Sequence, residues 1–224
     1  MIKHWKDDEE LFSLARRTLM TALVGDAMDK MGLVHQFLPP YLKSLDDSMV
    51  VVGRAMTVVE EDVSGEDPGR PLFGKMFEAL DDLKLHEVYV CSGASPSYAL
   101  WGEMMSTRAR KLGAAGAVID GYSRDTPGIL KLNFPTFSRG RYAQDQGPRG
   151  QVVDFRVKLR FGEVTINPGD IIFGDLDGVC VVPQGAEVEV FTRAFDKASR
   201  EKTLQKALEN GMSTVEAFHK FGIM

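Results

Sequence analysis

The sequence predicts a single α/β domain built around parallel strands, and three observations support this prediction. A βαβ unit lies near the middle of the chain, with strands predicted over 87–91 and 117–120 and a helix over 101–112 between them. The strands of such a unit run parallel, and the crossover is nearly always right-handed. Apolar residues make up 44% of the 224 residues, which is ordinary globular composition. No repeat or low-complexity linker divides the chain, so we expect residues 1–224 to form one domain.

Helices are predicted to flank this unit at both ends of the chain. Apolar residues recur at helical spacing over 8–31, with a break before Thr21. A long helix is predicted over 185–208. Ser213 precedes Glu216 by three residues, which is the spacing of a capping box and indicates a last short helix.

The rest of the chain is predicted to alternate between strands and turns. The Val- and Met-rich segment 50–60 is typical of a strand, 64–71 of a loop and 72–83 of a helix. After the βαβ unit, apolar runs separated by Gly, Pro and Asp turns predict five further short strands, over 134–139, 152–161, 163–166, 171–173 and 179–182.

Composition argues against several classes of protein. The formal net charge is -5 and no dense Lys/Arg run is present, so we expect no nucleic-acid partner. The sequence lacks the run of about 18 apolar residues that a transmembrane helix needs, so no membrane partner is expected. Cys91 and Cys180 lie in predicted strands, where free buried thiols are typical. Together with the absence of an apolar N-terminal stretch, this favours a cytoplasmic protein.

Three charged residues are predicted to meet at one edge of the sheet. In parallel α/β units, ligands bind outside the carboxyl ends of the strands. The loop after the first strand of the βαβ unit leads to Glu103 at the start of the helix, and the loop after the second strand carries Arg124 and Asp125. We therefore expect Glu103, Arg124 and Asp125 to lie near one another, although 20 residues separate Glu103 from Arg124.

These residue types suit an anion beside a divalent cation. The first amides of a helix, here near Met104 and Met105, attract a carboxylate, and the Arg124 guanidinium binds one with a fork of donors. Carboxylates such as those of Asp125 and Glu103, with no Cys or His nearby, favour Mg²⁺ or Mn²⁺ over Zn²⁺. Such a pair of sites can chelate a 2-oxo acid and stabilise the enolate that forms when a C–C bond breaks.

The same residues resemble a known family. The segments that carry the resemblance are WGEMM at 101–105, GAAGAVIDG at 113–121, Arg124-Asp125, FPTF at 134–137 and GD at 169–170 followed by DLDGV at 175–179. Together they resemble the RraA-like family, which includes the 4-hydroxy-4-methyl-2-oxoglutarate aldolases. The similarity covers most of the chain and is strongest over 88–183.

The resemblance implies a swivelling β/β/α fold, with flanking N- and C-terminal helices, that assembles into homotrimers or homohexamers. It implies a divalent-metal-dependent, class II-type aldolase that releases pyruvate, with oxaloacetate decarboxylation as a side activity. Asp125 would bind the metal directly and Glu103 through water, while Arg124 would bind substrate. Gly102 and the amides of Met104 and Met105 would hold the pyruvyl carboxylate. A further acid would come from a neighbouring subunit, and Glu201 is the candidate.

This chain departs from the pattern of the aldolases at two positions. The aldolases typically have Asp at the first acidic position, where this chain has the longer Glu103. They also tend to carry an acid three residues after the metal-binding Asp, where this chain has Gly128. The metal site is therefore expected to be completed differently here, and the natural substrate to differ.

Two other functions stay open at this point. The family also includes non-catalytic regulators that bind a ribonuclease, which tend to be shorter and to lack the acid that matches Glu103. A related 2-oxo acid enzyme, such as a tautomerase, hydrolase or other lyase, is the third possibility. Retention of Glu103 and the additional terminal helices favour the aldolase or decarboxylase.

Overall fold

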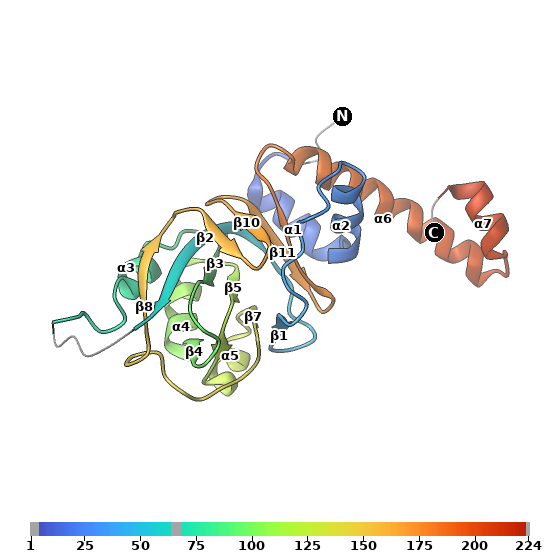
Figure 1. The fold of residues 1–224 in the computed structure, drawn as a ribbon. Helices are drawn as coiled ribbons and strands as arrows, with labels where there is room; N and C mark the ends of the chain where they lie inside the picture. The colour runs from blue at the N-terminus through green and yellow to red at the C-terminus, as the bar shows by residue number, and fades with distance from the viewer. Residues whose placement is uncertain (1–4, 64–68, 223–224) are drawn as a thin grey trace.

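A mixed sheet forms the centre of the molecule in this computed structural model, which describes residues 5–63 and 69–222 (Figure 1). Within these residues the sheet has eight strands, in the order β1-β7-β5-β3-β2-β11-β12, and β8 pairs with β2 as well. Two smaller sheets, β9 with β10 and β4 with β6, lie outside it. The strands are β1 (Lys43–Ser44), β2 (Val51–Asp62), β3 (Glu87–Ser92), β4 (Ala99–Trp101), β5 (Gly116–Ile119), β6 (Tyr122–Ser123), β7 (Thr136–Ser138), β8 (Gly150–Phe155), β9 (Leu159–Phe161), β10 (Val164–Ile166), β11 (Ile171–Asp175) and β12 (Gly178–Val182).

The predicted βαβ unit is present, and its strands are parallel. β2 pairs with β3, β3 with β5 and β5 with β7, all in parallel register. The strands on the two flanks, β1, β8, β11 and β12, pair antiparallel with their neighbours. The carboxyl ends of four neighbouring parallel strands therefore lie along one edge, as the site prediction requires.

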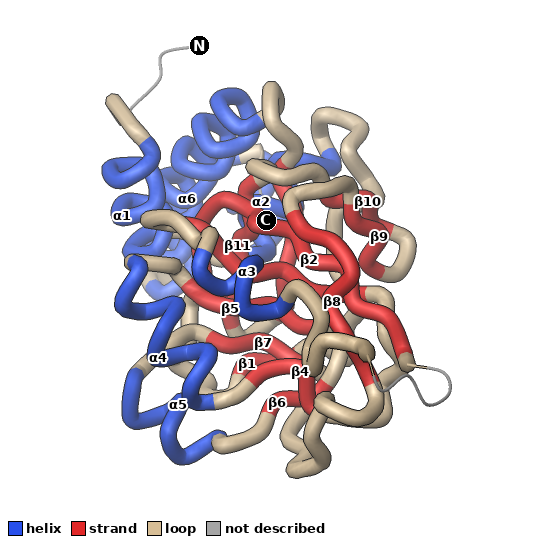
Figure 2. Tube along the Cα trace, turned by 90° about the vertical axis from the view of Figure 1, so that its left-hand side faces the viewer, coloured by secondary structure: helices blue, strands red, loops and turns tan. Residues whose placement is uncertain are grey.

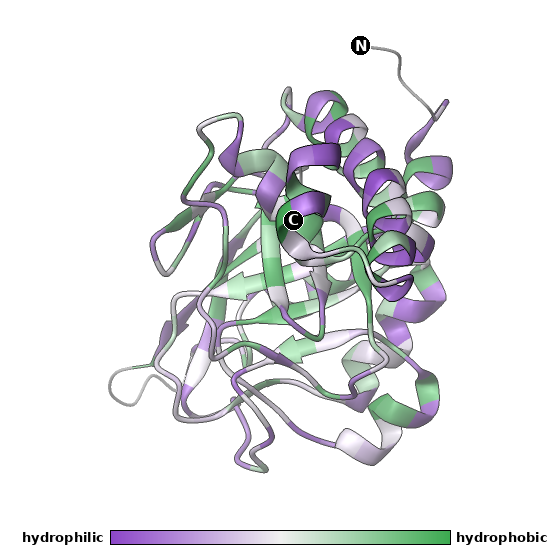
Figure 3. Cartoon of the chain, turned by 90° about the vertical axis from the view of Figure 1, so that its right-hand side faces the viewer, coloured by the Kyte–Doolittle hydropathy of each residue, from purple (hydrophilic) through white to green (hydrophobic). Residues whose placement is uncertain are grey.

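Helices cover both faces of this sheet (Figure 2). In β11, Ile171 and Phe173 pack with α1 (Asp8–Thr18), α2 (Thr21–Asp29) and α6 (Glu187–Glu209), whereas Ile172 packs into the larger core on the other side. This alternation follows from the two-residue period of a strand. The larger core includes residues of α3 (Met76–Asp81), α4 (Glu103–Leu112) and α5 (Thr126–Leu132). Figure 3 shows hydrophobic residues along the strands, while the helices also carry hydrophilic ones.

The C-terminal helices extend away from the sheet (Figure 1). α6 ends at Glu209, and α7 (Thr214–Phe221) folds back beside it around a small separate core that contains Leu204 and Ala217. The capping box predicted for Ser213 and Glu216 is confirmed, because both of its reciprocal hydrogen bonds are present. Within the described part of the chain, no helix is long and apolar enough to cross a membrane.

Several predicted boundaries are wrong. The helix predicted over 101–112 begins only at Glu103, because the three residues before it form β4. The helix predicted over 72–83 is the shorter α3, and the strand predicted over 152–161 is interrupted between β8 and β9. The helix over 8–31 is divided as expected, with an extended Leu19 after α1. Of the loop predicted over 64–71, residues 64–68 lie outside the described residues.

Candidate active site

Two short strands bring the predicted site residues together at the carboxyl edge of the parallel strands. β4 lies between β3 and α4, and β6 lies between β5 and α5. They pair with each other in parallel, outside the main sheet. The pairing continues one residue past β6, where the backbone N–H of Arg124 donates to the carbonyl of Trp101 at 2.9 Å. The start of α4 is thereby attached to the Arg124-Asp125 turn.

Asp125 has an unusual backbone that turns its carboxylate toward the start of α4. Its φ is 55°, in the left-handed region that only Gly, Asn and Asp adopt readily. Although Asp125 occupies the N-cap position of α5, its side chain makes no capping hydrogen bond. A Cβ atom placed at Gly102 would lie 2.8 Å from Asp125 Oδ2. Glycine at position 102 therefore leaves room for this carboxylate.

The turn and the helix start border a pocket with a volume of about 190 Å³. Arg124 and Asp125 line it, as predicted, together with Gly102, Met104 and Met105. The other lining residues come from β4, from α3 and the turn before it, and from the loop before β8: Ala99, Leu100, Trp101, Phe73, Met76, Phe77, Leu80, Asp145 and Gln146.

The Arg124 side chain lies between two carboxylates at the mouth of this pocket. Its Nη1 atom is 3.0 Å from Asp145 Oδ1, and its Nε atom is 3.7 Å from Asp125 Oδ2. All three side chains are more than a third exposed, so these ion pairs add little to stability. Their main effect is to orient the guanidinium, whose remaining donors can bind a substrate anion.

Sequence reasoning missed Asp145 and Gln146, which line the pocket from a loop without periodic pattern. The parallel bridge between Ala99 and Asp145 holds this loop beside β4. Gln146 is 3% exposed, and its Nε2 donates to the carboxyl of Glu60. The one indication of Gln146 in the sequence is Glu60, an acidic residue near the end of a predicted buried strand. A buried acid at that position requires a polar partner.

Glu60 is a buried acid behind the pocket wall. Its side chain is 1% exposed, and burial raises its pKa to about 8, with a further increase from the charge of Asp62. The hydrogen bond from Gln146 acts in the opposite direction. The Sγ of Cys91 lies 4.0 Å from the same carboxyl group, and burial raises the pKa of this thiol well above its usual value. Neither of the two groups lines the pocket.

Glu103 reaches the predicted edge, but its side chain leaves the pocket. The residue begins α4 beside Gly102, yet it is not among the described residues that line the pocket. Its carboxylate packs against Gly128 in α5, where an added Cβ atom would lie 2.6 Å from Glu103 Cγ and would overlap the carboxylate. Glu103 and Asp125 are therefore both close to the start of α5, but only Asp125 lines the pocket.

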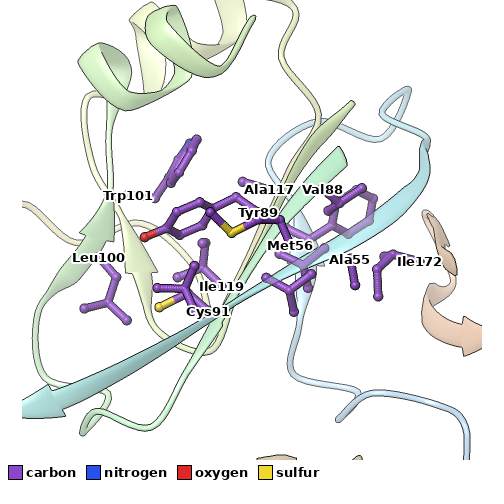
Figure 4. Close-up of a cluster of buried hydrophobic side chains, with 14 of the residues drawn as sticks. Ala55, Met56, Val88, Tyr89, Cys91, Leu100, Trp101, Ala117, Ile119 and Ile172 are labelled. Atoms are coloured by element: carbon purple, nitrogen blue, oxygen red, sulfur yellow. The ribbon is translucent and has the colours of Figure 1, made fainter. Parts of the chain in front are cut away.

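A rigid aromatic layer supports the start of α4 from below. Trp101 is 1% exposed, lies 4.9 Å from Tyr89 between ring centroids, and stacks on Phe134 at 6.1 Å. Its indole N–H donates to Ser106 Oγ at 2.7 Å, which joins β4 to the first turn of α4. Figure 4 shows Trp101 above Tyr89 in the core beneath the site. This packing fixes the backbone on which the pocket depends.

Glu201 lies in a different part of the chain from the pocket. It is on α6, which packs on the opposite face of the sheet from α4, and it pairs with Lys197 at 3.3 Å. It borders a separate depression between α2 and α6. Within one chain, Glu201 therefore does not join Arg124 and Asp125.

The donor set of one chain fits a partly hydrated hard cation. Among the described residues, no three His, Cys, Asp or Glu side chains gather into a metal-binding group. Mg²⁺ is commonly held by one or two carboxylates, several waters and the substrate. Asp125 and Asp145 offer exposed carboxylates that line the pocket, whereas the Glu103 carboxylate, also a hard donor, lies against Gly128 in α5. The residues present are therefore compatible with Mg²⁺ or Mn²⁺.

The fold and the site define an α/β protein with a pocket lined by Arg124 and Asp125 at the carboxyl edge of its parallel strands. A family model described as RraA-like, Aldolase/RraA, matches residues 21–181. The chain belongs to the RraA-like family, and both the predicted family and the predicted fold are confirmed.

Relatives of the chain include proteins provisionally named as aldolases. One from Halalkalibacterium halodurans, provisionally named 4-hydroxy-4-methyl-2-oxoglutarate aldolase, is 32% identical over 202 residues, which is 90% of each chain. An uncharacterized protein from Pseudomonas syringae has a solved structure with a TM-score of 0.81 and 30% identity, covering 96% of this chain and 99% of its own. RraAS2 of Streptomyces coelicolor, described as an unusual member of the RNase ES inhibitor RraA family, has a TM-score of 0.76 and 25% identity over 90% of this chain and 98% of its own.

Proposed function

We propose that this protein is a divalent-metal-dependent lyase that cleaves a C–C bond of a small 2-oxo acid and releases pyruvate. The observation that carries the proposal is the junction of Arg124 and Asp125 with the start of α4, through the hydrogen bond from Arg124 N to Trp101 O. This junction places a guanidinium, a carboxylate and the first amides of a helix around one pocket. The aldolase names of relatives such as the Halalkalibacterium protein support the same class.

The chain's own groups would bind and orient the substrate. The first N–H groups of α4, at Met104 and Met105, have no acceptor within the helix and suit the carboxylate of a 2-oxo acid. Arg124 would bind the substrate oxygens on which negative charge develops. Asp125, with Glu103 through water, would hold Mg²⁺ or Mn²⁺, which supplies electrostatic stabilisation of the enolate when it is bound. Oxaloacetate decarboxylation would form the same pyruvate enolate, so we propose it as a side activity.

We also propose that the protein acts as a homotrimer or homohexamer. α7 carries two exposed apolar side chains, Val215 at 65% and Phe218 at 56%, on a helix that extends from the sheet. A second copy of the chain could cover them and bring its Glu201 toward the metal site. The formal charge of -5 gives no reason to propose a nucleic-acid partner, and the cytoplasmic location stays a prediction from the sequence.

The test is pyruvate release, coupled to lactate dehydrogenase, from 4-hydroxy-4-methyl-2-oxoglutarate and oxaloacetate with Mg²⁺, Mn²⁺ or EDTA. We expect turnover that EDTA abolishes and that Arg124→Ala lowers about 10²–10³-fold, since one donor aimed at developing charge is lost. Arg160→Ala is the matched control, because this exposed Arg pairs with Glu163 in the β9–β10 hairpin and does not line the pocket. Turnover that resists EDTA, or that persists unchanged in Arg124→Ala, would contradict the proposal.

A second candidate is a regulator that binds a ribonuclease without catalysing a reaction. The likeness to the Streptomyces coelicolor protein supports it. Absence of turnover with any 2-oxo acid, together with inhibition of a ribonuclease by the purified protein, would favour this candidate over the lyase.

A further inference from the structure

The pocket at Arg124 is lined by two chemically different groups of side chains. The polar group is Arg124, Asp125, Asp145 and Gln146. The apolar group, called the apolar wall, consists of six side chains from α3, from the turn before α3 and from α4: Phe73, Met76, Phe77, Leu80, Met104 and Met105. A substrate held at Arg124 by its carboxylate would therefore direct its far end either at this wall or away from the pocket.

Two side chains of the apolar wall, Phe77 and Met104, are too exposed to be explained as core packing. Met76 and Leu80 are buried, at 6% and 7% exposure, and they anchor α3 to the body of the protein. Phe77 and Met104 are 57% and 70% exposed, on two different helices that face the same pocket. The rings of Phe73 and Phe77 pack edge to face at 5.7 Å between centroids. Adjacent exposed apolar side chains that line a concave site are typical of a surface that binds an apolar group.

The charges of the pocket argue against a second carboxylate on the substrate. Among the described residues that line the pocket, Arg124 is the only cation, against the two carboxylates of Asp125 and Asp145. Arg124 is already paired with Asp145 at 3.0 Å and would be shared with the substrate's first carboxylate. A second carboxylate at the apolar wall would be removed from water without a cationic partner, which is unfavourable.

Further cations lie close to the pocket lining without belonging to it. Arg149 Nη1 donates to the carbonyl of Asp145 at 3.0 Å, and Arg70 Nη2 donates to that of Gly147 at 3.4 Å, so both are bound to the backbone of this loop. Another is Arg141. Arg141 borders a shallow depression on the other side of Arg124 and Asp125. Its Nη2 donates to the carbonyl of Leu45 at 2.9 Å, and its charge contributes to the lowered pKa of Asp46. Arg141 is therefore directed toward the β1 region rather than toward the pocket.

We infer that the substrate is a 4-hydroxy-2-oxo acid whose substituent at C4 is apolar, such as an aryl or branched alkyl group, rather than a second carboxylate. This inference rests on the proposed lyase function. The hydroxyl at C4 loses its proton to water and becomes the carbonyl of the leaving product as the C3–C4 bond breaks. The electron pair of that bond moves into the pyruvate enolate. Water then returns a proton to C3. The products are pyruvate and an apolar aldehyde or ketone, and no oxidant or reductant is consumed.

The test compares two substrates that differ at C4. With Mg²⁺ present, we expect kcat/KM for pyruvate release from 4-hydroxy-2-oxo-4-phenylbutanoate to exceed that for 4-hydroxy-4-methyl-2-oxoglutarate about tenfold or more, a ratio that an apolar contact can supply. Phe77→Lys should reverse this preference, because it removes part of the wall and adds a cation. Leu85→Lys is the matched control. Leu85 is 65% exposed but lies outside this pocket, in the turn before β3.

The binding of 2-oxo acids tests the inference even if no turnover is detected. Calorimetry with Mg²⁺ should give tighter binding of 2-oxo-4-phenylbutanoate than of 2-oxoglutarate, and Phe77→Lys but not Leu85→Lys should remove the difference. A preference for 2-oxoglutarate that Phe77→Lys leaves unchanged would overturn the inference and leave the lyase intact. Loss of pyruvate release from every substrate would instead contradict the lyase. If Phe77→Lys dissociates an oligomer and weakens both ligands equally, the wall is a contact between copies, and the inference is wrong.

Discussion

The carboxylate of Glu103 fills the space in which a side chain at Gly128 would begin. An added Cβ atom at position 128 would overlap the Glu103 carboxylate and lie 2.6 Å from its Cγ. The two positions at which we expect this chain to depart from the pattern of the aldolases are therefore in direct contact. A longer acid at 103 and an absent side chain at 128 form one compensated arrangement, in which a single carboxylate reaches the first turn of α5.

This contact predicts that Gly128→Ala acts through Glu103. The new methyl group displaces a flexible side chain, and the gain in helix propensity of Ala over Gly, about 1 kcal/mol, offsets the crowding. We expect the melting temperature to change little but Mn²⁺ binding, measured by calorimetry, to weaken as much as in Glu103→Ala. Because the two changes remove the same carboxylate, the double variant should bind Mn²⁺ no more weakly than Glu103→Ala alone. Additive effects would show that Gly128 acts independently.

The ion pair between Asp145 and Arg124 predicts a positioning role for Asp145. We expect Asp145→Asn to lower kcat for pyruvate release about tenfold, less than Arg124→Ala, because the guanidinium loses one of its two carboxylate contacts but stays in the site. In the Arg124→Ala background the same change should have no further effect on kcat. A matched control is Asp154→Asn, at an exposed pair with Lys75 outside the pocket. Equal effects of Asp145→Asn in both backgrounds would refute the role.

Burial of Glu60 predicts a pH dependence of stability. Its pKa is about 8 in the folded protein against an ordinary value of 4.5, so the folded state binds the extra proton between these values. The stabilisation from Glu60 is complete below pH 4.5 and is lost as pH rises toward 8, on the order of a few kcal/mol. Glu60→Gln keeps the neutral shape and removes this loss.

Urea unfolding at pH 5, 7 and 9 measures the effect of Glu60. We expect the free energy of unfolding of Glu60→Gln to exceed that of the natural chain by an amount that increases with pH and levels off above pH 8. Glu61→Gln, at the exposed neighbouring position, should follow the natural chain at every pH. A pH-independent difference between Glu60→Gln and the natural chain would mean that Glu60 is ionised in the folded protein throughout this range.

The hydrogen bonds of Asp120 predict that this residue stabilises the fold at the same sheet edge. Its carboxylate accepts hydrogen bonds from Arg139 Nε and Tyr41 Oη, both at 2.8 Å, and from Ser92 Oγ at 2.9 Å. The Asp120 side chain is only 14% exposed. Asp120→Ala should cost about 2–3 kcal/mol of unfolding free energy, because it leaves these donors without their acceptor. Asp81→Ala, which removes the 64%-exposed partner of Arg108, should cost less than about 1 kcal/mol in the same denaturation assay.

The sequence predicted the parts of this molecule that local pattern controls. The βαβ unit and the capping box at Ser213 are confirmed, because hydrophobic period and capping chemistry act over a few residues. The meeting of Arg124 with the start of α4 followed from topology alone, since strand ends in a parallel sheet share an edge. No local rule placed Asp145 beside Arg124, because that contact depends on the path of a loop without periodic pattern.

The direction of the Glu103 side chain could not be predicted for a similar reason. The sequence places its backbone at the first turn of α4, but the rotamer depends on the open space above Gly128 in a different helix. The strand β4 was missed because Ala99–Trp101 is too short for a period, and its hydrogen bonds are made to β6 across twenty residues of chain. Non-local packing decides both features.

The left-handed backbone of Asp125 limits the residues that can replace it during evolution. Most side chains are disfavoured at a φ of 55°, so drift at residue 125 is constrained by conformation as well as by chemistry. Glutamate keeps the charge but not the preferred backbone, whereas asparagine keeps the backbone but not the charge. A lineage that lost the carboxylate at position 125 while retaining this fold would therefore pass most easily through asparagine or glycine.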